Sequence, residues 1–482
     1  MADSRTASLK LMPHIQKVVD IQSKIIYFLL SVILSFALSY ALYEPAMDKA
    51  QIYVLFMLFL AVGLWITEAI PPFAVGLLVF GFLIFAMNSY YSEVDPENVQ
   101  AHYIGYINSW SSSFIWLMLG GFFMAEAMRK TQLDRLVFRL SISRFGTKPK
   151  FILLGLMLTT ALFSMIMSNT ATTAMMIASV LPFVKTLDED SPFSKAILLG
   201  ISGAASIGGM GTLIGSPPNA IAVEALNNHG VDIGFLEWMM VGFPLAIFFT
   251  FIFWLLLSKR YIPRVKEVKI DLEKEDKDDP ESLYKFERIK KRIVLGVLGL
   301  TLLLWLTEKV HGIPASVVSL LPIILLTMSG VISGDDVRKL PWDTLMLVAG
   351  GLALGLAIKE TGLASFYVEK IQEFDLNFYI LVLCFGFLTV ILSNIMSNTA
   401  TATILIPVGI ILTFQNPIVL PLVIGLSASA ALFLPISTPP NAIAYSTGKL
   451  AQKDFRFGGI SLGLMAPVVI TAVVLLIYTW LA

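Results

Sequence analysis

The chain has 482 residues, of which 56% are hydrophobic and 14% are charged, and its formal net charge is zero. Soluble proteins carry about 25% charged residues, so the composition excludes an ordinary soluble protein, and the charge balance gives no sign of nucleic-acid binding. The single cysteine, Cys384, lies inside an apolar run, which excludes a disulfide framework and a cysteine metal cluster.

The apolar residues are gathered in runs of 14 to 22 residues, and the longer runs are long enough to cross a membrane. A helix needs about 20 apolar residues to span roughly 30 Å of hydrocarbon. The first run is longer than the core of a signal peptide and lacks a small-residue cleavage site, so we expect it to be a retained span. The runs predict membrane helices over Ile25–Tyr43, Ile52–Ile66, Phe73–Met87, Leu236–Leu257, Ile293–Leu306 and Ile460–Leu481.

The charge of the connecting segments alternates along the chain. The loop Asn88–Trp110 and the stretch Val223–Met240 contain no Lys or Arg, whereas residues 129–150 and the segment Lys259–Arg292 are rich in both. The positive-inside rule places the basic segments in the cytoplasm, with the N-terminus inside and the C-terminus outside a bacterial inner membrane. The 259–292 segment is also rich in Asp and Glu, which predicts a solvated cytoplasmic linker rather than a regulatory or lipid-binding segment.

Four short motifs occur twice and in the same order. Their separation falls only from 240 to 222 residues along the chain, which indicates one duplicated unit. We count five spans between equivalent points, and an odd number turns the second copy upside down. The predicted parts are a tail with the first span (1–50), a first repeat (51–258), the linker and a second repeat (293–482). The motif pairs are Leu64-Trp-Ile-Thr-Glu68 with Leu304-Trp-Leu-Thr-Glu308, Gly120-Gly121 with Gly350-Gly351, Ser168-Asn-Thr-Ala-Thr172 with Ser397-Asn-Thr-Ala-Thr401, and Ser216-Pro-Pro-Asn-Ala-Ile-Ala222 with Thr438-Pro-Pro-Asn-Ala-Ile-Ala444.

Each Ser-Asn-Thr motif lies between two apolar runs. Cytoplasmic charge borders both runs of the first repeat, so we predict a re-entrant hairpin over about 151–187, and a second hairpin from the outside over about 378–414. Ser, Asn and Thr are favoured helix N-caps, and here they precede an apolar helix. Irregular backbone at membrane depth is tolerated where it lines protein or a wet cavity.

The Pro-Pro-Asn motifs predict a second pair of interruptions. Proline cannot continue the interior of a helix, so Pro217 and Pro439 should each end a span near the middle of the membrane and begin a half-helix. The predicted broken helices cover about 195–229 and about 418–450. Paired broken helices at equivalent positions are the strongest sequence indication of a transport site.

The residues at these interruptions offer neutral oxygen atoms, which suit a hard cation such as Na⁺. The half-helix N-termini offer backbone N–H groups to an anion. Because the tips contain no Lys or Arg, an anion would need a cation to accompany it, and two equivalent tips suit a substrate with two carboxylates. The oxygens come from Ser164, Ser168, Asn169, Thr170, Ser393, Asn398, Thr399 and the carbonyl groups near Gly215 and Ser437.

Other functions fit the sequence less well. A proton relay usually needs acids or histidines within the membrane, and we interpret the acids near the span ends (Glu68, Glu126, Glu224, Glu308 and Glu360) as mainly structural. A single Ser-Asn-Thr motif in a membrane helix usually forms hydrogen bonds between packed helices, but the duplication of the motif argues against that role here. The chain has no recognisable catalytic dyad for a membrane enzyme. The sequence also leaves a channel with inverted hairpins as an alternative.

The paired Ser-Asn-Thr and Pro-Pro-Asn motifs resemble those of the divalent-anion/sodium symporter family, over nearly the whole chain from about Ile52. The resemblance implies an all-α polytopic membrane protein with two inverted repeats, about eleven transmembrane helices and two re-entrant hairpins. It also implies a homodimer and an elevator mechanism, with Na⁺ as the co-transported ion and no organic cofactor.

The resemblance further implies a role for each site residue. The Na⁺ ligands would be Ser164, Ser168, Asn169 and Gly215 at the first site, and Ser393, Met396, Asn398 and Ser437 at the second. The substrate would contact Ser168, Asn169, Thr170, Ser397, Asn398, Thr399, Thr438 and Pro439. The expected activity is symport of C4-dicarboxylates such as succinate, malate or fumarate. A dicarboxylate exchanger and a Na⁺-coupled carrier of citrate or sulfate are the alternatives.

Overall fold

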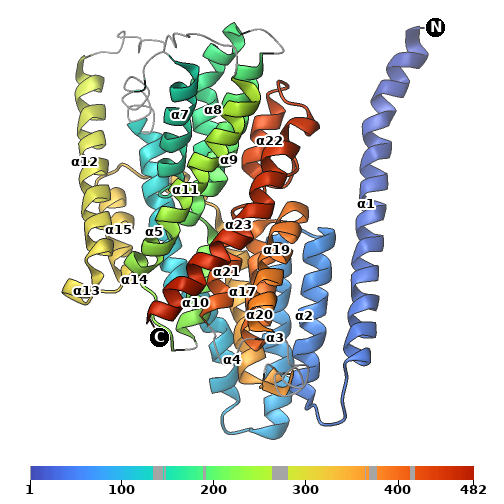
Figure 1. Ribbon diagram of the computed structural model, residues 1–482. Helices are drawn as coiled ribbons and strands as arrows, with labels where there is room; N and C mark the ends of the chain where they lie inside the picture. The colour runs from blue at the N-terminus through green and yellow to red at the C-terminus, as the bar shows by residue number, and fades with distance from the viewer. Residues whose placement is uncertain are drawn as a thin grey trace. The chain divides into compact units, whose positions relative to one another are not determined.

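The computed structural model describes residues 2–133, 145, 148–187, 191–228, 230–262, 281–363, 365–367, 377–412 and 418–481. This part of the chain is built from helices (Figure 1). Nine of the described helices are long and apolar enough to cross a membrane, and four further apolar helices are shorter. The fold is therefore all-α and polytopic, whereas the inverted repeat and the total of eleven spans stay predictions.

The chain forms two compact units. The first comprises Met1–Trp110 and Met346–Lys370, and the second comprises Ser111–Leu345 and Ile371–Ala482. In the first unit, α2 packs against α1 and α3, and α3 packs against α4. The helices of the first unit are α1 (Ala2–Ala41), α2 (Lys49–Thr67), α3 (Pro72–Val94), α4 (Val99–Asn108) and most of α17 (Trp342–Glu360).

The second unit contains all the residues predicted for the site. Within it, α7 packs against α9, α9 packs against α8 and α11, and α19 and α20 both pack against α21. Its helices are α5 (Ser113–Lys130), α7 (Pro149–Ser164), α8 (Asn169–Thr186), α9 (Pro192–Gly208), the 3₁₀ turn η2 (Gly209–Gly211), α10 (Pro217–Asn227), α11 (Phe235–Tyr261), α12 (Glu281–Leu306), α13 (Glu308–His311), α14 (Ala315–Val318), α15 (Leu320–Met328), α16 (Gly334–Arg338), α19 (Phe378–Ile395), α20 (Asn398–Leu412), α21 (Val419–Ala428), α22 (Pro439–Ser446) and α23 (Gln452–Leu481).

Each Ser-Asn-Thr motif lies at a sharp junction between two helices. Residues 165–168 separate α7 from α8, and residues 396–397 separate α19 from α20. Ser168 is the N-cap of α8, where its hydroxyl accepts a hydrogen bond from the Ala171 N–H at 3.2 Å, and the Ser397 hydroxyl accepts one from the Ala400 N–H at 3.1 Å. These bonds satisfy N–H groups that an apolar environment would otherwise leave unpaired.

Each Pro-Pro-Asn motif begins a short helix after an irregular segment. The first segment runs from the end of α9 to Pro217, and the second runs from the end of α21 to Pro439. Proline suits the first turn of a helix because the N–H that it lacks would have no intrahelical acceptor there.

The two short helices pack against the opposite half of the chain. In the second unit, α10 packs against α20 and α21, whereas α22 packs against α8 and α9 (Figure 1). The approach is close at Gly425, where a Cβ atom would lie 3.1 Å from Ala222 Cβ and 3.3 Å from the Pro218 carbonyl oxygen. Because each short helix packs against helices of the other half, the two halves are interlocked around the predicted site.

Two segments are more helical than their charge predicts. Within the expected loop Asn88–Trp110, α3 continues to Val94 and α4 occupies Val99–Asn108, whose Tyr106 side chain is fully buried. Residues 263–280 of the predicted linker lie outside the described residues, but α12 begins at Glu281. The charge of these segments therefore did not indicate that their backbone lacks regular structure.

An ion pair joins the end of α5 to the short helix α16. Lys130 donates a hydrogen bond to Asp336, and the Ser333 hydroxyl donates to the same carboxylate oxygen at 2.5 Å. Burial favours a raised pKa for Asp336, but the hydrogen bonds from Lys130 and Ser333 outweigh it and hold the pKa well below its usual range. The pair fixes the segment between α15 and α17 at one end of α5.

The first glycine of the pair at 120–121 marks a tight crossing of two segments. A Cβ atom at Gly120 would lie 2.6 Å from the Ser319 carbonyl oxygen and 2.7 Å from Ser319 Cβ. Position 120 therefore accepts no side chain unless the backbone at Ser319 moves.

We expect Gly120→Ala to destabilise the protein by about 1–3 kcal/mol, because overpacking displaces backbone at this crossing. The apparent melting temperature of the detergent-purified protein measures the effect. The matched control is Gly299→Ala on α12, where an added Cβ meets nothing within 4 Å. A Gly120→Ala protein that melts at the same temperature as the control would contradict the crossing.

Candidate functional site

The first hairpin tip brings three oxygen atoms around the Asn169 amide. Ser164 is fully buried at the end of α7, and its hydroxyl donates to the Ala205 carbonyl oxygen at 2.6 Å. In the orientation that gives every contact a donor, the Asn169 amide nitrogen lies 2.6 Å from Ser164 Oγ, 3.1 Å from the Ala205 oxygen and 3.2 Å from the Gly215 oxygen. The tip of the hairpin is thereby tied to the segment between α9 and α10.

The same amide position could serve a cation when the amide turns over. Its oxygen would then face Ser164 Oγ and the carbonyl oxygens of Ala205 and Gly215. The two ends of an Asn amide have nearly the same shape but opposite hydrogen-bonding character, so one position can hold a donor or a cation ligand. Neutral oxygens of this kind are ligands for a hard cation.

Asn219 of the first Pro-Pro-Asn motif holds the irregular segment before α10. Its side-chain nitrogen donates to the carbonyl oxygens of Gly209 and Thr212, both at 2.8 Å. Trp238 on α11 donates to the Met210 carbonyl oxygen at 2.9 Å, and Thr212 Oγ1 donates to the Met165 carbonyl oxygen. These side chains replace the intrahelical bonds that the break removes, which is required of buried backbone.

The second tip has the same plan but leaves more oxygen atoms unpaired. Ser393 is fully buried near the end of α19. Within the described part of the chain, Ser393 Oγ and Asn398 Oδ1 are buried and have no hydrogen-bond partner. Since buried polar atoms are nearly always paired, two such atoms at a predicted cation site indicate a missing partner that an ion could supply.

Asn441 holds the second irregular segment as Asn219 holds the first. Its side-chain nitrogen donates to the Leu434 carbonyl oxygen at 3.0 Å, and it lies 3.3 Å from both the Leu432 carbonyl oxygen and Ser437 Oγ. The Asn394 side chain accepts a hydrogen bond from the Phe433 N–H at 2.8 Å, which ties the hairpin to this segment.

Burial divides the predicted residues into two groups. Five of the predicted cation ligands are buried, namely Ser164, Gly215, Ser393, Met396 and Ser437. Those predicted to contact substrate are more accessible, except Thr438, which is 3% exposed and caps α22 by accepting from the Asn441 N–H. The accessible ones are Ser168, Asn169, Ser397, Asn398 and Thr399, which are half-buried, and Thr170 and Pro439, which are exposed. The cation ligands that were not also predicted to contact substrate are therefore all buried, whereas Ser168, Asn169 and Asn398, which were predicted for both roles, are half-buried.

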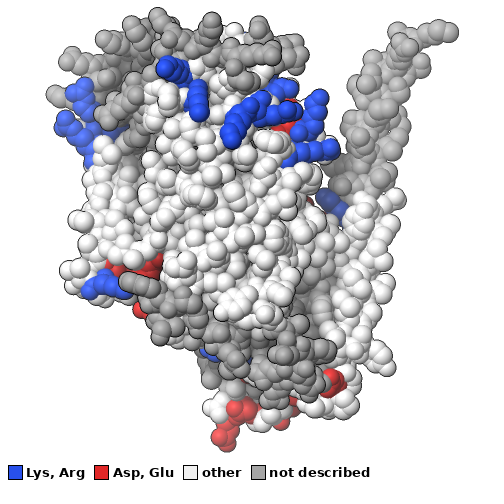
Figure 2. Space-filling model, viewed as in Figure 1, with Lys and Arg blue, Asp and Glu red and all other residues white. Residues whose placement is uncertain are grey.

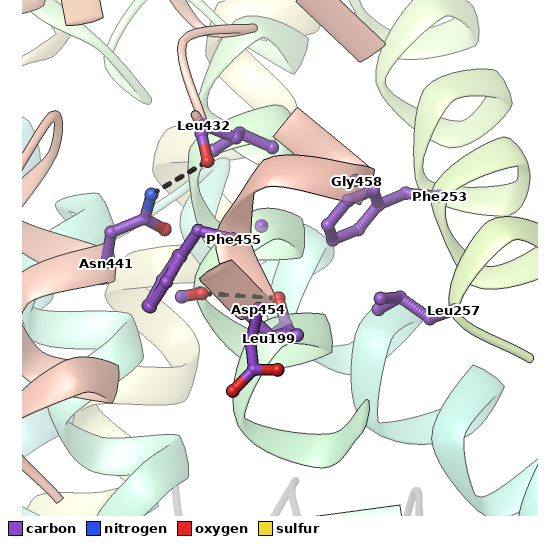
Figure 3. A pocket seen from close by; sticks show the side chains of 10 residues that line it. Leu199, Phe253, Leu257, Leu432, Asn441, Asp454, Phe455 and Gly458 are labelled. Carbon is purple, nitrogen blue, oxygen red and sulfur yellow. Dashed lines mark hydrogen bonds between the residues drawn. The ribbon is translucent and has the colours of Figure 1, made fainter. Parts of the chain in front are cut away.

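A small pocket lies beside the second Pro-Pro-Asn motif, lined by residues of α9, α11 and α23 together with Asn441 and Leu432 (Figure 3). The pocket also includes Asp454, whose carboxylate lies 3.4 Å from Lys195 Nζ and accepts from the Ala451 N–H at 2.8 Å. The charge of Asp454 is therefore balanced by Lys195.

The surface agrees with a protein that has an apolar middle. Figure 2 shows most of the visible Lys and Arg side chains above a wide band of uncharged residues, and a smaller group beside Asp and Glu below it. Such a band suits contact with lipid hydrocarbon.

Sequence reasoning did not assign roles to Asn219, Asn441, Thr212 or the Ala205 carbonyl group. The two asparagines had a visible signal, because each follows a repeated Pro-Pro pair and a break needs side-chain donors for its carbonyl groups. The Ala205 carbonyl had none, since a backbone atom of an alanine inside an apolar run carries no motif.

Comparisons with known proteins identify relatives that match most of the chain. A family model described as citrate transporter matches residues 62–415. The sodium-dependent dicarboxylate transporter SdcS of Staphylococcus saprophyticus is 32% identical over 480 residues, covering 92% of this chain and 89% of the relative. SdcS of Staphylococcus aureus strain USA300 is 31% identical over 460 residues, covering 88% and 85%.

Two solved structures share the fold at low sequence identity. The Alcanivorax borkumensis YdaH transporter has a TM-score of 0.56 and 13% identity, covering 85% of this chain and 98% of that one. Neisseria gonorrhoeae MtrF, described among antimetabolite efflux pumps, has a TM-score of 0.52 and 12% identity, covering 84% and 94%. The family match, together with relatives above 30% identity over most of their length, shows that the chain belongs to the divalent-anion/sodium symporter family, whose members are transporters and not enzymes.

Proposed function

We propose that the protein couples the inward movement of Na⁺ to the uptake of C4-dicarboxylates such as succinate, malate or fumarate across the bacterial inner membrane. The names of its relatives, sodium-dependent dicarboxylate transporters, support both the ion and the substrate class. The preference for C4-dicarboxylates over the larger citrate rests on the resemblance of the paired motifs to those of the divalent-anion/sodium symporter family.

The observation that carries the proposal is the neutral character of the site. Every residue predicted to bind cation or substrate is uncharged, and both tips combine buried oxygen atoms with more accessible hydroxyl and amide groups. A dicarboxylate entering such a site loses solvation without gaining a fixed positive charge. A bound Na⁺ beneath each tip would supply that charge, so the ion and the anion would stabilise each other.

The hairpins supply the remaining interactions with the anion. The N-terminus of α8 begins at Asn169 and that of α20 begins at Asn398, and helix N-termini favour negative charge. Ser168 and Ser397 already bind N–H groups of the first turn, which leaves the hydroxyls of Thr170 and Thr399 for a carboxylate. One carboxylate at each tip accounts for a preference for dicarboxylates.

We further propose an elevator mechanism in a homodimer, with the N-terminus in the cytoplasm. The helices that carry the site, α7 to α10 and α19 to α22, pack on one another within the second unit and could move as one body. The interlocking of α10 and α22 with the opposite half favours a rigid displacement of this bundle over independent motion of the two tips.

One variation of the proposed function, citrate as the substrate, has support of its own, and two others do not. The description of the matching family model favours citrate as an alternative substrate. A dicarboxylate exchanger would use the same anion site without net Na⁺ movement. A sulfate carrier would fit the two-tip geometry less well, because sulfate cannot extend one carboxylate to each tip.

We expect succinate uptake into proteoliposomes to require an inward Na⁺ gradient and to fall by about an order of magnitude or more when choline replaces Na⁺, because the neutral site binds the dianion weakly without its cation. Radiolabelled uptake with a panel of competing C4-dicarboxylates, citrate and sulfate measures both coupling and specificity. Equal uptake in choline would contradict symport, and uptake that depends on internal succinate would instead indicate exchange.

We expect Asn169→Ala or Asn398→Ala to reduce transport at least about a hundredfold, because each change removes a cation ligand and a substrate contact together. The measurement is Na⁺-driven uptake at matched protein levels, with gel filtration to verify folding. The control is Asn227→Ala, which loses a surface hydrogen bond to the Ile233 N–H and should transport normally. Normal uptake by either tip variant would return these asparagines to a structural role.

A further inference from the structure

The two halves of the site differ at a position that neither repeated motif includes. The segment before each Pro-Pro-Asn motif can be aligned without a gap, because Pro217 and Pro439 are equivalent. In this alignment Ser427 of α21 stands where α9 has Ala205. The second half thus carries a hydroxyl where the first half has a methyl group.

Contacts in the structure show that this alignment also holds in space. A Cβ at Gly211 would lie 2.6 Å from Met165 Cε, so residues 165 and 211 are neighbours in the first half. Their equivalents in the second half, Asn394 and Phe433, are joined by a hydrogen bond of 2.8 Å. The hairpins and the broken helices therefore pack in the same register in both halves.

The register predicts that Ser427 lies next to Ser393. In the first half, Ser164 Oγ bonds to the carbonyl oxygen of Ala205 at 2.6 Å, and the equivalents of these residues are Ser393 and Ser427. Ser427 is fully buried. Among the described residues, the Ser393 hydroxyl, the Ser427 hydroxyl and Asn398 Oδ1 are all buried without a hydrogen-bond partner.

A purely structural role for the Ser427 hydroxyl is not supported. A buried serine in a helix usually donates to a carbonyl oxygen in the preceding turn, as Ser202 does on α9 to Leu199 at 3.2 Å. Ser427 makes no such bond within the described part of the chain. Leaving a buried hydroxyl unpaired costs roughly 1–3 kcal/mol. Other buried hydroxyls, such as that of Ser429, are unpaired as well, so it is the predicted position of Ser427 beside Ser393 that distinguishes it.

We propose that the Ser427 hydroxyl is a direct ligand of the second Na⁺ site, together with Ser393 Oγ and Asn398 Oδ1. The inference rests on the proposed function and adds a ligand to it. The first site has no side-chain oxygen at position 205, so the second site has one more neutral oxygen for the ion.

The proposal also predicts which site fills first. At the first tip, the Asn169 amide must release Ser164, Ala205 and Gly215 before its oxygen can face an ion. At the second tip, the three oxygens have no bonds to release among the described residues. The second site therefore binds Na⁺ more tightly when substrate is absent.

The test is a Na⁺ titration of the purified full-length protein without substrate, read as the shift in melting temperature at constant ionic strength with choline chloride. Ser427→Ala should raise the half-maximal Na⁺ concentration about tenfold, which corresponds to about 1.4 kcal/mol. Ser427→Cys keeps the size of the side chain but replaces the hard oxygen with a softer sulfur, so it should behave like the alanine variant.

The matched control is Ser429→Ala. Ser429 is also buried with an unpaired hydroxyl, but it stands two residues further along, and positions separated by two do not share a helix face. The half-maximal Na⁺ concentration of the Ser429→Ala protein should stay within about twofold of the wild-type value. If both the Ser427→Ala and the Ser427→Cys proteins have the half-maximal Na⁺ concentration of the wild type, this inference is overturned and the proposed function is not affected. A wild-type protein that Na⁺ does not stabilise would overturn the proposed function and the inference together.

Discussion

Backbone carbonyl groups that a helix break exposes inside an apolar bundle must find donors, and the rest of the site depends on how this protein supplies them. Asn219 bonds two such groups in the first half, and Asn441 bonds Leu434 and approaches Leu432 in the second. The two asparagines stabilise irregular segments that would otherwise be costly inside an apolar bundle. In the first half, the carbonyl oxygens of Ala205 and Gly215 then face Asn169 at the hairpin tip.

The oxygen atoms gathered at the two tips define the chemistry. At the first tip, they surround an amide that can turn between donating hydrogen bonds and coordinating a cation. At the second tip, they lie buried without partners among the described residues. Because neither tip carries a formal charge, the site would bind a cation weakly by itself and an anion still more weakly. Coupling between ion and anion then follows from electrostatics, as a mutual increase in affinity.

Much of this arrangement was predictable from the sequence, because it rests on repeated motifs with a physical meaning. Helix N-caps predicted that Ser168 and Ser397 precede helices, and proline chemistry predicted that helices begin at Pro217 and Pro439. The packing of α10 and α22 against the opposite half could not be predicted, since no local pattern encodes which distant helices meet. The helical segments at Val99–Asn108 and Glu281–Arg292 were missed because charge and polarity were interpreted as loop, although helices tolerate both on an exposed face.

The central claim is that the neutral site binds a dicarboxylate only with Na⁺. Isothermal titration of the purified protein with succinate, in NaCl and in choline chloride at equal ionic strength, tests it most directly because it separates binding from movement. The account predicts measurable binding in NaCl, an affinity at least about a hundredfold weaker in choline, and the reciprocal effect of succinate on Na⁺ affinity. Equal succinate affinity in the two salts would contradict it.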